Sequence, residues 1–329
     1  MSRAVLIERL PGYVLQLLLL AVIGWLAWRG ISNFLTNAHT LGVSIGWGFL
    51  RTEAGFEIAQ TLVPFGPAST YGHAILVATL NTLLVVTLAI VFSTLIALFI
   101  AFGRLSTHPL VRGASTTYVE VFRNIPMLLQ IFFWYFSAIA LLPDVGESLH
   151  LGPALLNNRG LFLPHLMMSG ANGLSWDVPV VEGFNVSGGF ALLPELIALT
   201  LGLSIYNSTF LAEIFRAGIL SVPRGQSEAA ATVGLSGARA ALLVVLPQAL
   251  RVALPPAAGQ YQTLAKASSL AAAIGYPDIM QIVGGTVLSQ TGQALEAMAL
   301  VVLLYAAINL AIAFLVNLAN RRLMKRHAR

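Results

Sequence analysis

Residues Tyr71 to Gly103 read YGHAILVATLNTLLVVTLAIVFSTLIALFIAFG and contain no Asp, Glu, Lys or Arg. A helix needs about 20 largely apolar residues to cross the hydrocarbon core of a bilayer, so this stretch predicts one long, tilted transmembrane helix. The nearest charged residues on either side are Glu57 and Arg104. This segment therefore places the chain in a membrane.

The composition of the whole chain leads to the same assignment. Of 329 residues, 18 are Lys or Arg and 13 are Asp or Glu, so 9% are charged, and 57% are hydrophobic. Soluble globular domains contain about 25% charged residues, and a water-exposed surface cannot be covered with so few. An ordinary soluble protein is excluded. The chain has no cysteine, which also excludes disulfides, thiolate metal sites and cysteine nucleophiles.

Five further segments have the length and apolar character of a membrane span. They are Leu10 to Trp28, Asn124 to Pro143 with an extension back to about Ser115, Leu196 to Ala212, about Ala240 to Ala265, and Ala297 to Asn320. Pro126, Pro255 and Pro256 predict breaks in two of these helices. The sequence thus predicts an all-α integral membrane protein with six transmembrane helices.

The basic residues predict the orientation of these spans. Six spans place both termini on one side of the membrane. With both termini inside, the cytoplasmic segments hold twelve basic residues and the external segments only three, Arg29, Arg51 and Arg159. Cytoplasmic loops carry an excess of Lys and Arg, so we expect a multi-pass membrane protein with both termini cytoplasmic.

Two external segments are longer than simple turns, residues 31–69 and residues 141–194. The second is rich in Gly and Pro. Segments of this size rarely bury enough apolar surface to fold alone, so we expect both to pack on the external mouth of the helices.

The longest cytoplasmic segment between spans, residues 216–240, reads RAGILSVPRGQSEAAATVGLSGARA. Pro223 and Gly225 end the preceding span, and a short Ala-rich helix from Gln226 to Val233 follows, with Glu228 in its first turn. Gly234 permits the turn that ends this helix. A rigid helix that leaves the membrane in this way can be held by a partner, and the Glu228 carboxylate can pair with a cation on it. The alternative is a solvated Ala-rich loop without a partner.

The spacing of this segment resembles the EAA loop of the membrane subunits of binding-protein-dependent ABC importers. It runs Glu228-Ala229-Ala230, three residues, Gly234, nine residues, Val244, then Leu246-Pro247. The stretches YNSTFLAEIFRAGILSVPRGQSEAA (206–230) and VVLPQALRVALPP (244–256) are similar to those of polar amino-acid permeases. The additional first span and the long insertion resemble the larger subunits of general L-amino-acid importers.

This resemblance implies a domain organisation. Residues 1–70 are expected to form an N-terminal anchor helix and an external loop, and residues 71–322 a five-helix type I ABC importer domain. That domain includes the external insertion at 141–194 and the coupling loop at 216–240. Residues 323–329 form a basic cytoplasmic tail.

The resemblance also implies a function and partners. The chain would be the permease of an ATP-driven importer that moves polar or a broad range of L-amino acids by alternating access. Its partners would be the lipid bilayer, a second and non-identical permease chain, two subunits that bind ATP and Mg²⁺, and a periplasmic amino-acid-binding protein. No nucleic acid is implied. The residues implied to couple to the ATP-binding subunit are Gln226, Glu228, Ala229, Ala230 and Gly234.

Several activities are not expected of this chain. Its two lysines, Lys266 and Lys325, do not precede Ser or Thr in a Gly-rich loop, so it has no Walker A site and is not itself an ATPase. No histidine pair has metal-ligand spacing on a helix, so no metal site or cofactor is predicted. An ion-coupled secondary transporter or a channel is the alternative function, but it leaves the EAA spacing unexplained.

Charged residues within spans are costly and mark either structural pairs or working parts. Glu120 with Arg123, and Glu213 with Arg216, are spaced i,i+3 and predict intramembrane pairs on one helix face. They either anchor helix ends or change partners during transport. Lys266 has no local partner and is a candidate for the translocation path or for an ion pair with another helix.

An amino-acid path needs polar groups that replace water around an ammonium and a carboxylate. Such groups also bond to neighbouring helices or to their own backbone, and both roles remain open at each position. The candidates for the path are Gln130, Tyr206, Asn207, Thr209, Gln262, Lys266, Ser268 and Ser269.

Overall fold

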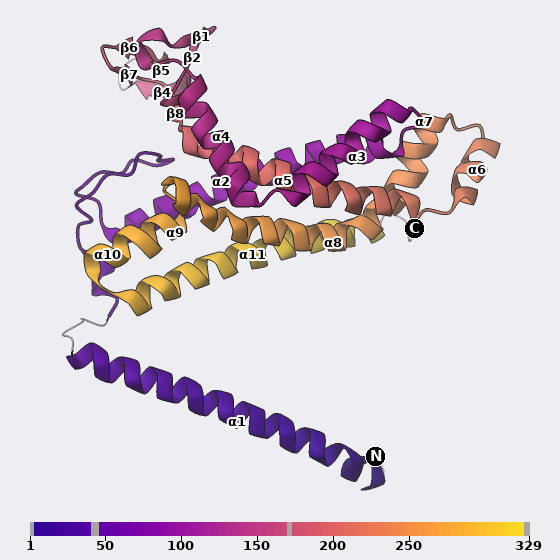
Figure 1. Cartoon of the computed structure of the whole chain (residues 1–329), viewed down its shortest axis with the longest axis horizontal. Coiled ribbons are helices and arrows are strands. Elements are labelled where there is room, and N and C mark those ends of the chain that lie inside the picture. Colours follow the sequence, from indigo (N-terminus) through magenta and orange to yellow (C-terminus); the bar gives the residue numbers. More distant parts are fainter. Residues whose placement is uncertain (1–2, 41–45, 170–172, 326–329) are drawn as a thin grey trace.

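The computed structural model describes residues 3–40, 46–169 and 173–325 and is dominated by long helices (Figure 1). Five helices contain apolar stretches long enough to cross a membrane. They are α1 (Arg3–Thr40), α2 (Tyr71–Leu105), α5 (Pro194–Leu220), α8 (Leu246–Ala267) and α11 (Ala294–Lys325). The bent pair α3 (Pro109–Asn124) and α4 (Met127–Leu141) provides a sixth span. The prediction of a helical membrane protein is confirmed, with five spans, or six when the bent pair is taken as one span.

The third predicted span is not one continuous helix. α3 and α4 meet at an angle of 100°. The break lies at Ile125, which is extended because the next residue is Pro126. Gln130 closes the break, because its amide nitrogen donates to the carbonyl oxygens of Phe122 at 2.8 Å and Ile125 at 3.1 Å. The break expected at Pro126 is therefore present, and its freed carbonyls find a donor within the same segment.

The prediction of a break at Pro255 and Pro256 is wrong. Both prolines lie inside α8, which runs through them without interruption. Both residues are exposed on the surface of the helix. The irregular turns lie at the two ends of α8 instead, as a π-helical turn at Ala241–Val245 and a 3₁₀ segment at Ser268–Ile274.

Helix α5 is the centre of the bundle, packed against α2, α4 and α8. Its Leu199 and Leu203 are fully buried in one core cluster with Val85 of α2 and Leu264 of α8. Gly202 lets α4 approach closely, because a Cβ at this position would collide with Ile131. Helix α1 takes no part in this core, since none of the side chains in its apolar stretch is buried, and it lies apart from the bundle in Figure 1.

The external insertion forms strands, which the sequence did not reveal. β1 (Leu149–Leu151), β2 (Ala154–Asn157), β3 (Gly160–Leu163) and β8 (Phe190–Leu192) make an antiparallel sheet in the order β1-β2-β3-β8. Two separate two-stranded sheets are formed by β4 (His165–Ser169) with β5 (Gly173–Asp177), and by β6 (Val180–Glu182) with β7 (Asn185–Ser187). These strands project from the ends of α4 and α5 rather than packing over the mouth of the bundle (Figure 1). They can do so because ladder hydrogen bonds pair their backbone groups within the insertion.

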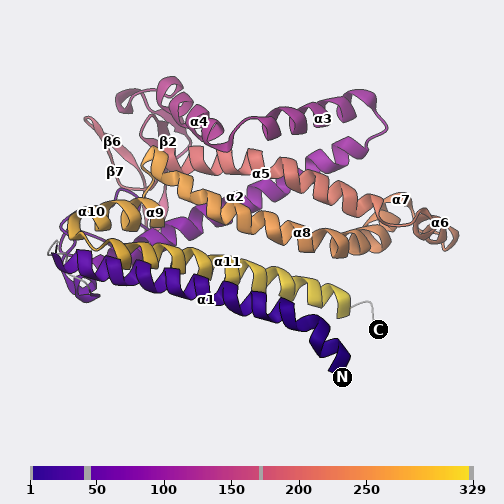
Figure 2. The ribbon, with the colours of Figure 1, turned by 60° about the horizontal axis from the view of Figure 1, so that its bottom comes forward.

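Short helices lie at the two ends of the bundle. Figure 1 shows α6 (Arg224–Thr232) and α7 (Gly237–Ala240) at the same end as the last turns of α11 and the first turns of α1. The strands, α9 (Ile279–Gln281) and α10 (Leu288–Thr291) lie toward the opposite end. Figure 2 shows the same division from another side. Residues 326–329 of the predicted basic tail lie outside the described residues.

Candidate functional site

Helix α6 is the segment that the sequence singles out for coupling. It begins at Arg224, after Pro223, and ends at Thr232. Gly234 adopts the left-handed conformation with φ of +83°, so its N–H reaches the Ala231 carbonyl and the N–H of Leu235 reaches the Ala230 carbonyl. These two hydrogen bonds form the Schellman motif that satisfies the last carbonyls of a helix. The end of α6 is therefore sharply defined.

The surface of α6 is suited to a partner. Of the five predicted coupling residues only Ala230 is buried, while Gln226, Glu228, Ala229 and Gly234 are exposed. The Gln248 amide nitrogen donates to Gln226 Oε1 at 3.2 Å, which ties α6 to α8. Glu228 was expected in the first turn of the helix, but it lies in the second turn because α6 begins two residues earlier than predicted. Its exposed carboxylate is thus presented along the side of the helix.

The predicted pair Glu213 and Arg216 forms an ion pair at 2.5 Å on α5. Arg104, at the end of α2, binds the same carboxylate. One acidic side chain thus joins the ends of two spans and holds two guanidinium groups, which leaves a local excess of positive charge beside the α6 end of the bundle.

The predicted pair Glu120 and Arg123 is not formed among the described residues. Glu120 is exposed, while Arg123 turns toward α5 and donates to the Thr209 carbonyl at 2.9 Å. Its guanidinium also lies 4.7 Å from the centre of the Phe210 ring. The Thr209 carbonyl and the Phe210 ring, both on α5, take the place of the Glu120 carboxylate as partners of the guanidinium.

Several predicted path residues bond within the protein. Asn207 is buried and donates to Ser93 Oγ at 3.3 Å, and the buried hydroxyls of Thr209 and Ser268 donate to carbonyls of their own helices. Tyr206 stacks against Phe210, and Gln130 closes the break described above. Of these five side chains, Asn207 joins α5 to α2, and the other four make these contacts within their own helix or segment.

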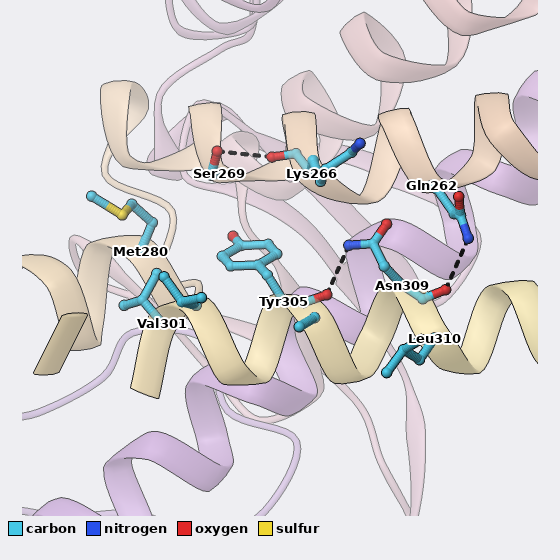
Figure 3. Close-up of a pocket in the computed structure, with 10 residues that line it drawn as sticks. Gln262, Lys266, Ser269, Met280, Val301, Tyr305, Asn309 and Leu310 are labelled. Carbon is cyan, nitrogen blue, oxygen red and sulfur yellow. Dashed lines mark hydrogen bonds between the residues drawn. The ribbon is translucent and has the colours of Figure 1, made fainter. Parts of the chain in front are cut away.

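Three predicted path residues do meet in one cavity. Gln262, Lys266 and Ser269 follow one another along one side of α8 and of the 3₁₀ turn after it, and they face α11 across a cavity of about 670 Å³ (Figure 3). The opposite wall is formed by Tyr305 and Asn309. The cavity lies within the membrane-spanning part of the bundle, between the last two spans.

Tyr305 and Asn309 were missed in the sequence. They are spaced i,i+4 in the otherwise apolar last span, which places two polar groups on one helix face. That spacing was the available signal. The Asn309 amide nitrogen donates to the Tyr305 carbonyl at 2.7 Å, and the Gln262 amide nitrogen donates to the Asn309 carbonyl at 3.2 Å.

A buried acid stands behind this cavity. Asp278, in the segment between the last two spans, accepts hydrogen bonds from the backbone N–H of Gln281 at 2.8 Å and from the Tyr305 hydroxyl at 2.8 Å. Burial raises the pKa of the Asp278 carboxyl to about 6, against the effect of these hydrogen bonds. Among the described residues, no group of three or more His, Cys, Asp or Glu side chains could hold a metal ion.

Comparison with known proteins assigns this chain to a family. Residues 93–325 match the family model described as "Binding-protein-dependent transport system inner membrane component". The chain belongs to this family. Its members are permease subunits of ABC importers, transport components that work with ATP-binding subunits and a substrate-binding protein. This membership favours the importer over the ion-coupled transporter or channel.

The similarity to named relatives extends over almost the whole chain. It is 41% identical to the putative amino-acid ABC transporter permease protein YhdX of Escherichia coli (strain K12), covering 93% of this chain and 92% of the relative. It is 38% identical to the general L-amino acid transport system permease protein AapQ of Rhizobium johnstonii, with 94% and 91% covered. For the glutamate/glutamine/aspartate/asparagine transport system permease protein BztB of Rhodobacter capsulatus the identity is 33%, again with 94% and 91% covered.

Solved structures share the fold of the helical part. A crystal structure of an amino acid ABC transporter with histidines matches 77% of this chain and 95% of its own at a TM-score of 0.55 and 25% identity. An inward-facing structure of the MetNI methionine ABC transporter matches at a TM-score of 0.51 and 17% identity, with 77% of this chain and 97% of its own covered. The type I ABC importer fold is thereby established for this chain.

Proposed function

We propose that this chain is a permease subunit that moves L-amino acids across the bacterial inner membrane. The observation that carries the proposal is the cavity between α8 and α11, where a lysine and two carboxamides meet inside the membrane-spanning bundle. Charged and amide groups at this depth are costly unless they face a pathway or one another. The names of the relatives support the same substrate class, because YhdX, AapQ and BztB are all described as amino-acid permeases.

The proposed coupling element is α6. In this account Gln226, Glu228, Ala229, Ala230 and Gly234 hold the helix in a groove of an ATP-binding subunit, and Glu228 pairs with a cation there. The exposed Glu228 and the defined end of α6 at Gly234 support this role. ATP and Mg²⁺ belong to that subunit, and two copies of it bind one importer.

The remaining partners and the orientation follow from the same proposal. A second, non-identical permease chain completes the pathway, and a periplasmic amino-acid-binding protein delivers the substrate to the strand-bearing external end. Both termini then lie in the cytoplasm beside α6. The twelve basic residues that this orientation places inside, against three outside, support it.

Affinity purification followed by uptake tests the proposal. The tagged chain, expressed with its natural partners and solubilised in mild detergent, should retain an ATP-binding subunit. After reconstitution into vesicles with the binding protein, it should accumulate labelled L-amino acids only when ATP is supplied. Uptake that follows an imposed ion gradient without ATP would contradict the proposal.

A further inference from the structure

The cavity between α8 and α11 contains one cation without a counter-ion. Lys266 is exposed to this space, and no carboxylate of the described residues lies within ion-pair distance of it. None of the residues that line the cavity is Asp or Glu. Asp278, which contacts Tyr305 of the cavity wall, is fully buried, and its carboxylate already accepts hydrogen bonds from the Tyr305 hydroxyl and the Gln281 N–H. The cavity therefore carries a net positive charge.

The two carboxamides beside Lys266 both bond to the backbone of α11. The N–H groups of Asn309 and Gln262 are both turned to backbone carbonyls of α11, at 2.7 and 3.2 Å. The Asn309 side-chain oxygen is buried and has no hydrogen-bond partner. Figure 3 shows Asn309 and Gln262 next to each other, with the amino group of Lys266 extending along α8 toward Gln262. Each amide nitrogen thus directs one of its two N–H groups to a carbonyl of α11, which fixes the orientation of both carboxamides.

The Ser269 hydroxyl adds no free donor to the cavity. It donates to the Lys266 carbonyl at 2.8 Å, so its proton is also used within α8 and the turn after it. Met280 and Val301 close the end of the cavity near Ser269 with apolar surface (Figure 3). The strong donor of the cavity is the ammonium of Lys266, and the side chain of Gln262 contributes an amide oxygen as an acceptor.

We infer that Lys266 sets the charge selectivity of the permease, so that the cavity accepts amino acids with acidic or neutral side chains and rejects those with cationic side chains. The inference rests on the proposed function. A substrate carboxylate binds Lys266, and its ammonium binds the side-chain oxygen of Gln262. A second carboxylate on the substrate is attracted to the Lys266 ammonium, whereas a guanidinium or a second ammonium meets a like charge.

The physical size of the effect follows from Coulomb's law. Two unit charges within about 8 Å at an effective dielectric constant of about 20 interact strongly enough to change an affinity by more than about tenfold. Reversing the sign of the substrate side chain reverses the sign of that interaction. We therefore expect glutamate to bind at least about tenfold more tightly than arginine at this cavity.

Equilibrium binding to the intact complex tests the inference. The permease complex is purified with its natural subunits but without the binding protein, and labelled glutamate, glutamine and arginine are titrated. The wild-type complex should prefer glutamate over arginine. Lys266→Gln should reduce the ratio of the two affinities by about tenfold or more, and Lys266→Glu should reverse it. Lys266→Arg keeps the charge and should keep the preference.

The other lysine of the chain provides a matched control. Lys325 is the last residue of α11, far along the helix from Tyr305 and Asn309, so Lys325→Gln should leave the ratio unchanged. An unchanged ratio in Lys266→Gln with binding intact would overturn the inference, as would the absence of amino-acid binding in the wild-type complex. Loss of the second permease chain from Lys266→Gln would overturn it too, because Lys266 would then serve an interface.

The two proposals fail in different ways. If the wild-type complex imports amino acids with ATP but the glutamate-to-arginine ratio does not depend on residue 266, only the selectivity inference fails. If no amino acid is imported under any condition, the proposed function fails first.

Discussion

Replacing Asp278 by Asn should remove the part of the pH dependence of the unfolding free energy that arises from ionisation of this carboxyl. The Asp278 side chain is fully buried, and burial raises its pKa to about 6 from an ordinary value of 3.8. Each tenfold change in proton affinity is worth about 1.4 kcal/mol, so the difference corresponds to about 3 kcal/mol. The folded state binds this proton more tightly than the unfolded state. Its contribution to stability is therefore complete below about pH 4 and is lost as the pH rises through about 6.

The assay is thermal unfolding in detergent at a series of pH values. The difference between Asp278→Asn and wild type should be small near pH 4 and should grow in favour of the variant up to about pH 7, because asparagine cannot ionise. Its side-chain oxygen can still accept the Gln281 N–H that caps α9. Glu182→Gln is the matched control, since it removes a carboxyl that is exposed on β6 and leaves Asp278 in place. A constant difference between Asp278→Asn and wild type across this range would refute the reasoning.

Three further substitutions test the packing and the polar contacts, each by thermal unfolding in detergent. Gly202→Val should destabilise the protein by about 1–3 kcal/mol, because α4 meets α5 at this point through Ile131. Gly259→Val is the control and should have little effect, because no atom lies within 4 Å of a Cβ added there. Equal losses of stability in the two variants would contradict the close packing of α4 on α5. Gln130→Ala should cost about 1–3 kcal/mol by leaving two carbonyls at the α3–α4 break without a donor, and an unchanged melting temperature would refute that role. Glu213→Gln should cost about 1 kcal/mol or less, because the pair is partly exposed, and the loss should shrink at high salt.

The sequence predicted the elements that depend on local composition. Uninterrupted apolar stretches such as Tyr71 to Gly103 identify spans, because crossing lipid imposes one length and one chemistry. Pro126 correctly marked a break, since it forces Ile125 into an extended conformation. The same reasoning failed at Pro255 and Pro256, where the helix continues and both residues are exposed on its surface.

The candidate site was only partly visible in the sequence. Gln262, Lys266 and Ser269 were identified as polar residues of one segment, but the opposite wall depends on the pairing of α8 with α11, which no local pattern encodes. Glu120 and Arg123 show the converse error, because their spacing ignores Thr209 and Phe210 on another helix. The strands of the insertion were missed because Gly-rich and Pro-rich composition masks short β segments whose stability comes from their pairing.

The central claim is that α6 transmits ATP-driven work to an amino-acid permease. Its most direct test measures ATP hydrolysis and labelled amino-acid uptake side by side in vesicles that contain the complete complex with either wild type or Glu228→Lys. We predict that the variant assembles but loses most of its ATP-driven uptake, because the charge at the exposed position on α6 is reversed. Assembly, hydrolysis and uptake that all equal those of the wild type would contradict the account.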